Sequence, residues 1–162
     1  MHSATASTNH PQHNALSQLL VLAEAHKFPQ VNYAGELSPQ QTYDYLAQQG
    51  GILIDVRTAP EWLQTGVPDT SKTKGAFMAA SWKLAPHFTI NPEFFTVLVK
   101  IAPETPLFFI CRSGGRSLDA AAAMTERGYK YCFNVADGFE GAQPNTASSW
   151  MGAGLPIKQV QP

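Results

Sequence analysis

The residues with the clearest chemical potential lie in one short stretch, residues 109–117, which reads FICRSGGRS. A cysteine follows an apolar run, and two glycines and two arginines come within the next five residues. The stretch matches neither the G-x-G-x-x-G nor the G-x-x-x-x-G-K-[ST] phosphate motif. Because a thiolate is a strong nucleophile, Cys111 is a candidate catalytic residue.

Two glycines follow Cys111 and give the backbone the freedom to turn successive N–H groups inward. Such N–H groups form a concave nest for an anion, and the positive end of a following helix adds to its attraction. A thiolate at the base of the nest is stabilised, since helix termini and neighbouring cations favour the charged form of cysteine. The stretch is therefore typical of a loop that binds anions.

Three of the four arginines in the chain, Arg57, Arg112 and Arg116, follow predicted strand ends or lie within this loop. The planar guanidinium suits oxyanions because it donates two parallel hydrogen bonds. This concentration indicates an anionic substrate, while a structural role is an equal alternative for Arg57.

The second cysteine, Cys132, lies between two aromatic residues in a predicted strand, which favours core packing over a role as a resolving thiol. For Cys111 a buried structural role is the weaker alternative, because glycines and arginines follow it. Two cysteines make no disulfide framework and lack the paired spacing of a zinc site. We therefore expect reduced thiols and a cytoplasmic protein.

Composition limits the remaining classes of function. The 162 residues, 44% hydrophobic and 14% charged, fit one globular domain. A net charge of −1, with no basic cluster, makes nucleic acid an unexpected partner. The apolar run at residues 19–23 is too short to cross a membrane, and residues 1–18 contain none of the Lys or Arg that a secretory signal needs.

Short apolar runs and helical segments alternate along the chain and must position these side chains. Strands are predicted at residues 52–56, 76–80, 107–110 and 131–135, and helices at 39–47, 91–101 and 117–127. Ser38 and Gln41 have the spacing of a capping box. This alternation predicts an α/β fold, with an open, mainly parallel sheet of about five strands and helices on both faces. Ligands bind at the carboxyl ends of such strands, where Cys111 lies.

Three segments are expected from composition. Residues 1–14 are polar and read as a flexible N-terminal tail. Residues 15–31 are predicted to form a helical extension that packs on the domain, and residues 32–162 form the domain itself.

Over residues 32–158 the sequence resembles the single-domain rhodanese-like sulfurtransferases. The resemblance rests on LIDVR at 53–57 followed by Glu61-Trp62, the Cys111–Ser117 loop, GFEG at 138–141, and Trp150 with GLPI at 154–157. It implies that Cys111 takes a sulfane sulfur from an anionic donor such as thiosulfate and holds it as a persulfide. The sulfur then passes to cyanide or to a thiol, including a protein thiol, without a metal or organic cofactor.

The resemblance also assigns roles around the cysteine. Arg112 and Arg116 hold the oxyanion of the donor, while Asp55 orders the loop and Arg57 joins that support. The loop residues that bind substrate are Arg112, Ser113, Gly114, Gly115, Arg116 and Ser117. Where the family commonly has Gly-His-Ile, this chain has GVP at 66–68 and a polar stretch up to residue 75. A second long connection lies at 142–149, and we expect both loops to shape the rim of the site, which leaves the acceptor open.

Two other functions remain as alternatives. Cysteine-dependent phosphatases and arsenate reductases also place an arginine at the end of a cysteine loop, but with five intervening residues; here four separate Cys111 from Arg116. A non-catalytic rhodanese module that binds a protein partner is the second alternative, and such modules often lose the cysteine that this chain retains.

Overall fold

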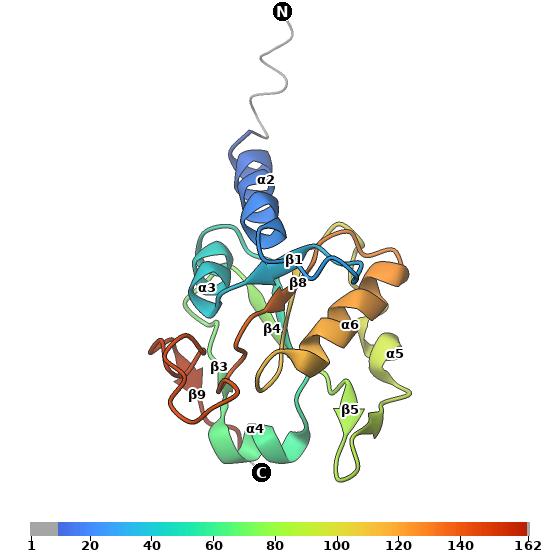
Figure 1. Ribbon diagram of the computed structural model, residues 1–162, viewed down its shortest axis with the longest axis vertical. Coiled ribbons are helices and arrows are strands. Elements are labelled where there is room, and N and C mark those ends of the chain that lie inside the picture. Colours follow the sequence, from blue (N-terminus) through green and yellow to red (C-terminus); the bar gives the residue numbers. More distant parts are fainter. Residues whose placement is uncertain (1–9, 162) are drawn as a thin grey trace, which may run out of the picture.

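A five-stranded parallel sheet forms the centre of the protein in the computed structural model, which describes residues 10–161. Its strand order is β1-β8-β7-β2-β4 (Figure 1). The strands are β1 (Gly35–Leu37), β2 (Ile52–Asp55), β4 (Ala76–Ala79), β7 (Leu107–Ile110) and β8 (Cys132–Val135). All four neighbouring pairs are parallel, which confirms the predicted α/β class.

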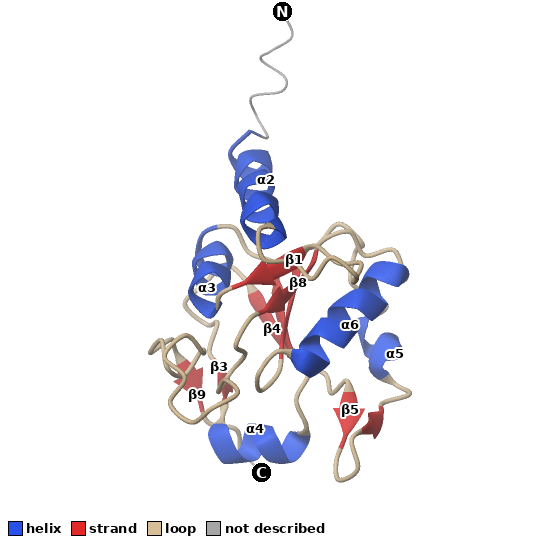
Figure 2. Ribbon diagram, viewed as in Figure 1, coloured by secondary structure: helices blue, strands red, loops and turns tan. Residues whose placement is uncertain are grey.

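Alternate side chains along the strands enter two separate cores, one on each face of the sheet. Leu53 and Phe108 pack with α2 (His10–Glu24) and α3 (Pro39–Gln48). Ile54 and Phe109, one residue further along their strands, pack with α5 (Phe94–Leu98) and α6 (Gly115–Glu126). Because successive strand residues point to opposite faces, near-continuous apolar runs are what a sheet covered on both sides requires. Helices therefore lie on both faces, as predicted (Figure 2).

Two of the predicted helices form close to their expected limits. The Ser38 hydroxyl accepts the Gln41 N–H at 3.0 Å and the Gln41 side chain accepts the Ser38 N–H at 2.9 Å, so α3 begins with the predicted capping box. Helix α6 starts two residues earlier than expected. Gly114 precedes it with a φ of 112°, a left-handed conformation that glycine adopts readily.

The other helices differ from expectation. Helix α5 covers only Phe94–Leu98 instead of residues 91–101, since Phe94 and Leu98 anchor a single turn while Val97 and Val99 are exposed. Helix α2 begins at His10, before the expected boundary at residue 15; Pro11 fits its first turn, where an N–H is not needed. Residues 1–9 of the expected tail lie outside the described residues. None of the helices within residues 10–161 has the length and apolar character needed to cross a membrane.

Several short elements were not predicted. Helix α4 (Ala59–Thr65) follows β2 along the chain and lies at the bottom of the view in Figure 2. Two antiparallel pairs, β3 (Val67–Pro68) with β9 (Ile157–Lys158) and β5 (Lys83–Leu84) with β6 (Thr89–Ile90), hold the long connections. Two-residue strands carry no alternating pattern, so their pairing depends on the tertiary structure.

The capping box of α3 provides a test of the fold. Ser38→Ala removes the acceptor for the Gln41 N–H, so we expect the free energy of unfolding to fall by about 1 kcal/mol. Urea denaturation followed by circular dichroism measures this difference. The exposed Ser17 of α2 supplies a matched control, and an equal loss in Ser17→Ala would contradict the assignment.

Candidate active site

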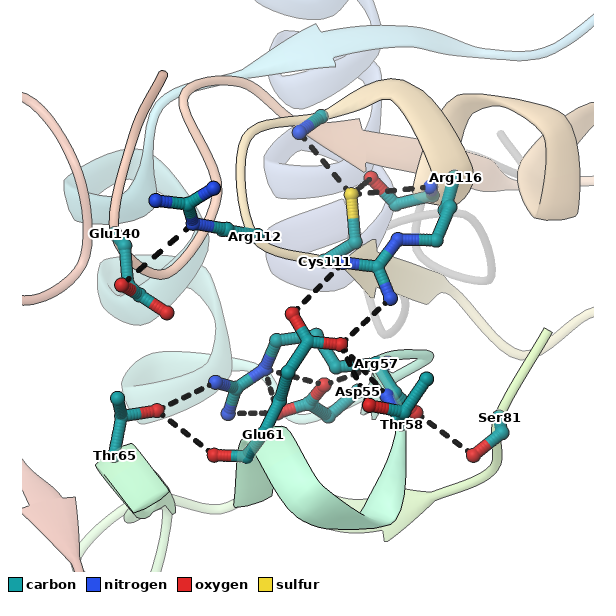
Figure 3. A network of polar contacts seen from close by, with 12 residues as sticks. Asp55, Arg57, Thr58, Glu61, Thr65, Ser81, Cys111, Arg112, Arg116 and Glu140 are labelled. Carbon is teal, nitrogen blue, oxygen red and sulfur yellow. Dashed lines mark hydrogen bonds and ion pairs between the residues drawn. The ribbon is translucent and has the colours of Figure 1, made fainter. Parts of the chain in front are cut away.

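Cys111 directly follows β7 at the carboxyl end of the sheet, and only 1% of its surface is exposed. Its Sγ accepts the Gly114 N–H at 3.1 Å and the Ser117 N–H at 3.4 Å (Figure 3). Both donors belong to the start of α6, where the helix dipole is positive. The backbone thus folds around the sulfur in an arrangement that favours negative charge there.

Segment 138–141 holds the first two peptides of the loop in place. Phe139 N–H donates to the Cys111 carbonyl at 2.8 Å, and the next two N–H groups both donate to the Arg112 carbonyl at 3.0 Å. A Cβ at Gly138 would lie 2.5 Å from both carbonyl oxygens, so only glycine fits this approach. Each carbonyl lies opposite the following N–H across its peptide plane. The N–H groups of Arg112 and Ser113 therefore point away from this segment.

A buried ion pair lies beneath that segment. Asp55 and Arg57 are both fully buried, and their closest atoms, Oδ2 and Nη2, are 2.7 Å apart. Arg57 also donates to the Gly66 carbonyl at 2.7 Å and lies over the Phe139 ring, 4.1 Å from its centroid. The Arg57 side chain is therefore inaccessible to a substrate. It packs against Phe139, whose N–H binds the Cys111 carbonyl. This position suits the supporting role expected for both residues.

Arg116 makes a two-point ion pair with Glu61, at 2.8 and 2.9 Å (Figure 3). The Glu61 carboxylate also accepts the Thr58 N–H at 3.0 Å in the capping box of α4. Burial acts to raise the pKa of Glu61, but the hydrogen bonds and charge of Arg116 and the Thr58 N–H outweigh it and lower the pKa to about 2. Arg116 therefore contacts Glu61 in this structure, and its expected contact with a donor oxyanion stays a prediction.

Arg112 is the loop arginine that reaches solvent, with 55% of its side chain exposed. Its Nε lies 3.7 Å from a Glu140 carboxylate oxygen, a loose contact compared with that of Arg116. Arg112 and Glu140 line a cleft of about 380 Å³ whose other wall is the connection 141–152. Four residues of the 142–149 connection line this cleft, and the role expected for that connection in shaping the rim of the site stays a prediction.

A buried polar network behind Cys111 was not predicted. The Ser117 hydroxyl lies 3.2 Å from Sγ and 2.6 Å from Asn134 Oδ1. Asn134 Nδ2 lies 3.1 Å from both carboxylate oxygens of Glu36, and Tyr33 donates to the same carboxylate at 2.6 Å. Burial raises the pKa of Glu36 while these two hydrogen bonds oppose the rise. One signal was present in the sequence: Asn134 is a polar residue inside an apolar strand run.

Cys132 lies at the opposite end of the sheet from Cys111. It begins β8 opposite Leu107, whereas Cys111 follows the other end of β7. Cys111 lies four residues beyond Leu107 along the strand direction, so at ~3.3 Å per residue the two cysteines are separated by roughly 13 Å along the sheet. Burial raises the pKa of Cys132 to about 11, with Thr125 opposing the rise. These features fit the predicted core role.

An open parallel sheet with a cysteine-led loop at a strand end, held by an Asp-Arg pair and a glycine segment, defines a rhodanese-type α/β domain. The rhodanese-like domain family matches residues 38–144, and the chain belongs to this family.

The chain is also similar to individual proteins over most of its length. A protein of Rickettsia conorii, named as uncharacterized, is 41% identical over 118 residues, covering 72% of this chain and 90% of the relative. Thiosulfate sulfurtransferase GlpE of Haemophilus influenzae is 31% identical over 122 residues, covering 75% and 92%. The crystal structure of Rv0390 from M. tuberculosis is similar with a TM-score of 0.71 at 36% identity, covering 80% of this chain and all of that one.

The pair of Arg116 and Glu61 predicts a pH-dependent contribution to stability. Glu61 has a lowered pKa in the folded chain, so its contribution is complete above the unfolded value of ~4.3 and is lost as pH falls through about 2. We expect Glu61→Gln to lower the free energy of unfolding at pH 6 by on the order of 2–3 kcal/mol, and by much less near pH 2.5. Urea denaturation at both pH values measures this.

The exposed pair of Glu104 and Lys130, 3.6 Å apart, supplies the control. Glu104→Gln should change stability by less than about 0.5 kcal/mol at either pH. A pH-independent loss in Glu61→Gln would show that lost packing, not the charge, causes the effect.

Proposed function

We propose that the protein is a sulfurtransferase that carries a sulfane sulfur on Cys111. The observation that carries this proposal is the buried Sγ at a strand end, approached by the N–H groups of Gly114 and Ser117. A similarity of 31% identity to thiosulfate sulfurtransferase GlpE supports the same chemistry. Anionic sulfur is the species that such a site stabilises.

The reaction divides into two displacements at sulfur. The Cys111 thiolate attacks the outer sulfur of thiosulfate, the S–S bond of the donor breaks, and sulfite leaves with its electron pair. Cys111 then carries a persulfide. An acceptor thiolate attacks the outer sulfur, the bond to Sγ breaks, and its electron pair restores the Cys111 thiolate. The acceptor leaves as a persulfide, or as thiocyanate when it is cyanide.

The loop favours sulfur over phosphate chemistry for two reasons. It is one residue shorter than a phosphatase loop, which leaves fewer N–H groups to surround three phosphate oxygens. Its terminal arginine is also engaged, because Arg116 contacts Glu61 through two hydrogen bonds. A phosphate would have to compete with that carboxylate. Phosphatase or arsenate reductase activity is therefore the weaker alternative.

Intact mass spectrometry tests the proposal. After incubation with thiosulfate, the chain should gain the mass of one sulfur atom, and addition of a thiol should remove it. Cys111→Ser should abolish the gain because a hydroxyl forms no persulfide. The matched variant Cys132→Ser should retain it, since Cys132 is buried in the core.

Each other outcome points to a different function. Aryl phosphate hydrolysis that depends on Cys111, without a mass gain, would replace this proposal with the phosphatase. Absence of both reactions in a folded protein would leave a non-catalytic binding module. Loss of the mass gain in both cysteine variants would indicate a two-cysteine relay.

We further propose that Arg112 binds the anionic donor, since it lines the cleft, is 55% exposed and meets Glu140 only at 3.7 Å. Arg112→Ala should slow loading from thiosulfate at least ~10-fold, the worth of one charge-assisted contact. It should affect discharge to a neutral thiol less. Stopped-flow measurement of the two half-reactions gives both rates.

Two further variants serve as controls for Arg112. Glu140→Gln removes the competing carboxylate and should leave loading unchanged or faster. Arg127→Ala removes an arginine that lies over the Phe95 ring, outside the site, and should leave both half-reactions unchanged. Equal slowing of both half-reactions in Arg112→Ala would mean that this residue only shapes the loop.

A further inference from the structure

The hydroxyl of Ser117 has a single proton and two neighbours that compete for it. Its Oγ lies 3.2 Å from Cys111 Sγ and 2.6 Å from Asn134 Oδ1. A hydroxyl donates one hydrogen bond and accepts others through its lone pairs. Which neighbour receives the proton decides whether Ser117 stabilises the thiolate or the thiol.

The orientation of the Asn134 amide answers this question. Its Nδ2 lies 3.1 Å from both carboxylate oxygens of Glu36 and 3.1 Å from the Gly114 carbonyl. Carboxylate and carbonyl oxygens only accept, so the amide nitrogen must face them. Tyr33 supplies a further donor to Glu36 at 2.6 Å and holds the carboxylate in place. Protonation of Glu36 would not reverse the amide, because the Gly114 carbonyl still requires a donor.

Oδ1 of Asn134 therefore faces Ser117 and can only accept. At 2.6 Å it takes the hydroxyl proton, and the lone pairs of Ser117 Oγ remain for Cys111. We propose that Asn134, anchored by Glu36, is a positioning residue that makes Ser117 an acceptor toward Cys111, so that this contact favours the thiol over the free thiolate. The hydrogen bond runs from Sγ–H to Ser117 and from Ser117 to Asn134.

A thiolate at Sγ has two unfavourable choices in this network. It can face the Ser117 lone pairs, or it can take the Ser117 proton and leave Asn134 Oδ1 buried without a donor. A persulfide avoids both, because its negative charge lies mainly on the outer sulfur. On the proposed function, the network thus favours the sulfur-loaded state over the free thiolate.

Charged groups approach this network from several elements. Arg116 on α6 is paired with Glu61 on α4, and the pair of Asp55 and Arg57 lies at the end of β2. On the other side, Glu36 on β1 lies near Asp137, whose charge also acts on it. Ser117→Ala leaves all of these charges in place and isolates the hydrogen bond to Cys111. A neutral substitution at Asn134 also removes a hydrogen bond that opposes the rise in the pKa of Glu36.

The test measures the rate at which iodoacetamide alkylates Cys111 as a function of pH. Cys132→Ser provides the background in which Cys111 is the remaining cysteine. The plateau rate at high pH reports access to the sulfur, and the midpoint reports its ionisation. Ser117→Ala should move the midpoint to lower pH by about 0.5 unit or more, or about threefold in thiolate fraction at low pH.

Asn134→Leu keeps the branching and the number of side-chain heavy atoms and removes the acceptor, which frees the Ser117 proton for the sulfur. Its midpoint should fall at least as far as that of Ser117→Ala. In the double variant the Asn134 substitution should add nothing, because Ser117 is the group through which it acts. Thr125→Val, which removes another hydroxyl from α6, should leave the midpoint unchanged.

Three results would overturn the inference in variants whose circular dichroism is unchanged. A midpoint that rises in Ser117→Ala would show that Ser117 donates to the thiolate. An unchanged midpoint would show that the hydroxyl has no effect on ionisation. Additive shifts in the double variant would show that Asn134 acts independently. Alkylation needs no sulfur donor, so a chain that shifts as expected but gains no sulfur would overturn the proposed function and leave this inference standing.

Discussion

The close approach of Gly138 to the loop is the constraint on which the rest of the site depends. A side chain at this position would collide with the carbonyl oxygens of Cys111 and Arg112, which are the acceptors for the N–H groups of segment 139–141. With those carbonyls held, the peptides on either side of Arg112 have fixed directions. The chain then turns through the left-handed Gly114 into α6, and two N–H groups meet at the sulfur. The ion pair of Asp55 and Arg57 acts on the loop indirectly, through the Phe139 ring.

The position of Cys111 followed from local sequence, whereas the pairing of its neighbours did not. An apolar run ending at Cys111 and two glycines are enough to place a cysteine at a strand end before a helix. The ion pair of Arg116 was missed because its partner, Glu61, lies 55 residues away in the sequence. The two side chains come together only when β2 and β7 pair. Glu36 was missed for the same reason, since β1 has three residues and gains its place by pairing with β8.

The three arginines looked alike in the sequence, but the fold gives them different exposure and different partners. Arg57 is fully buried against Asp55, Arg116 is held by Glu61, and Arg112 alone of the three has a mostly exposed side chain. A concentration of arginines is thus a poor measure of the positive charge available to a substrate. The carboxylates of Asp55 and Glu61 neutralise the charges of Arg57 and Arg116, and these ion pairs hold the side chains in place. On our proposal the donor meets one accessible guanidinium and a set of backbone N–H groups.

The surroundings of Sγ combine two opposing influences on its negative charge. The N–H groups of Gly114 and Ser117 and the start of α6 favour negative charge at the base of the loop. The Ser117 hydroxyl, directed by Asn134, favours a proton on Sγ itself. When the outer sulfur is added, the charge moves away from the lone pairs of Ser117 while it stays close to the helix terminus. On the proposed function, a site built in this way stabilises the loaded cysteine more than the bare thiolate, which is the order of stabilities that a sulfur carrier requires.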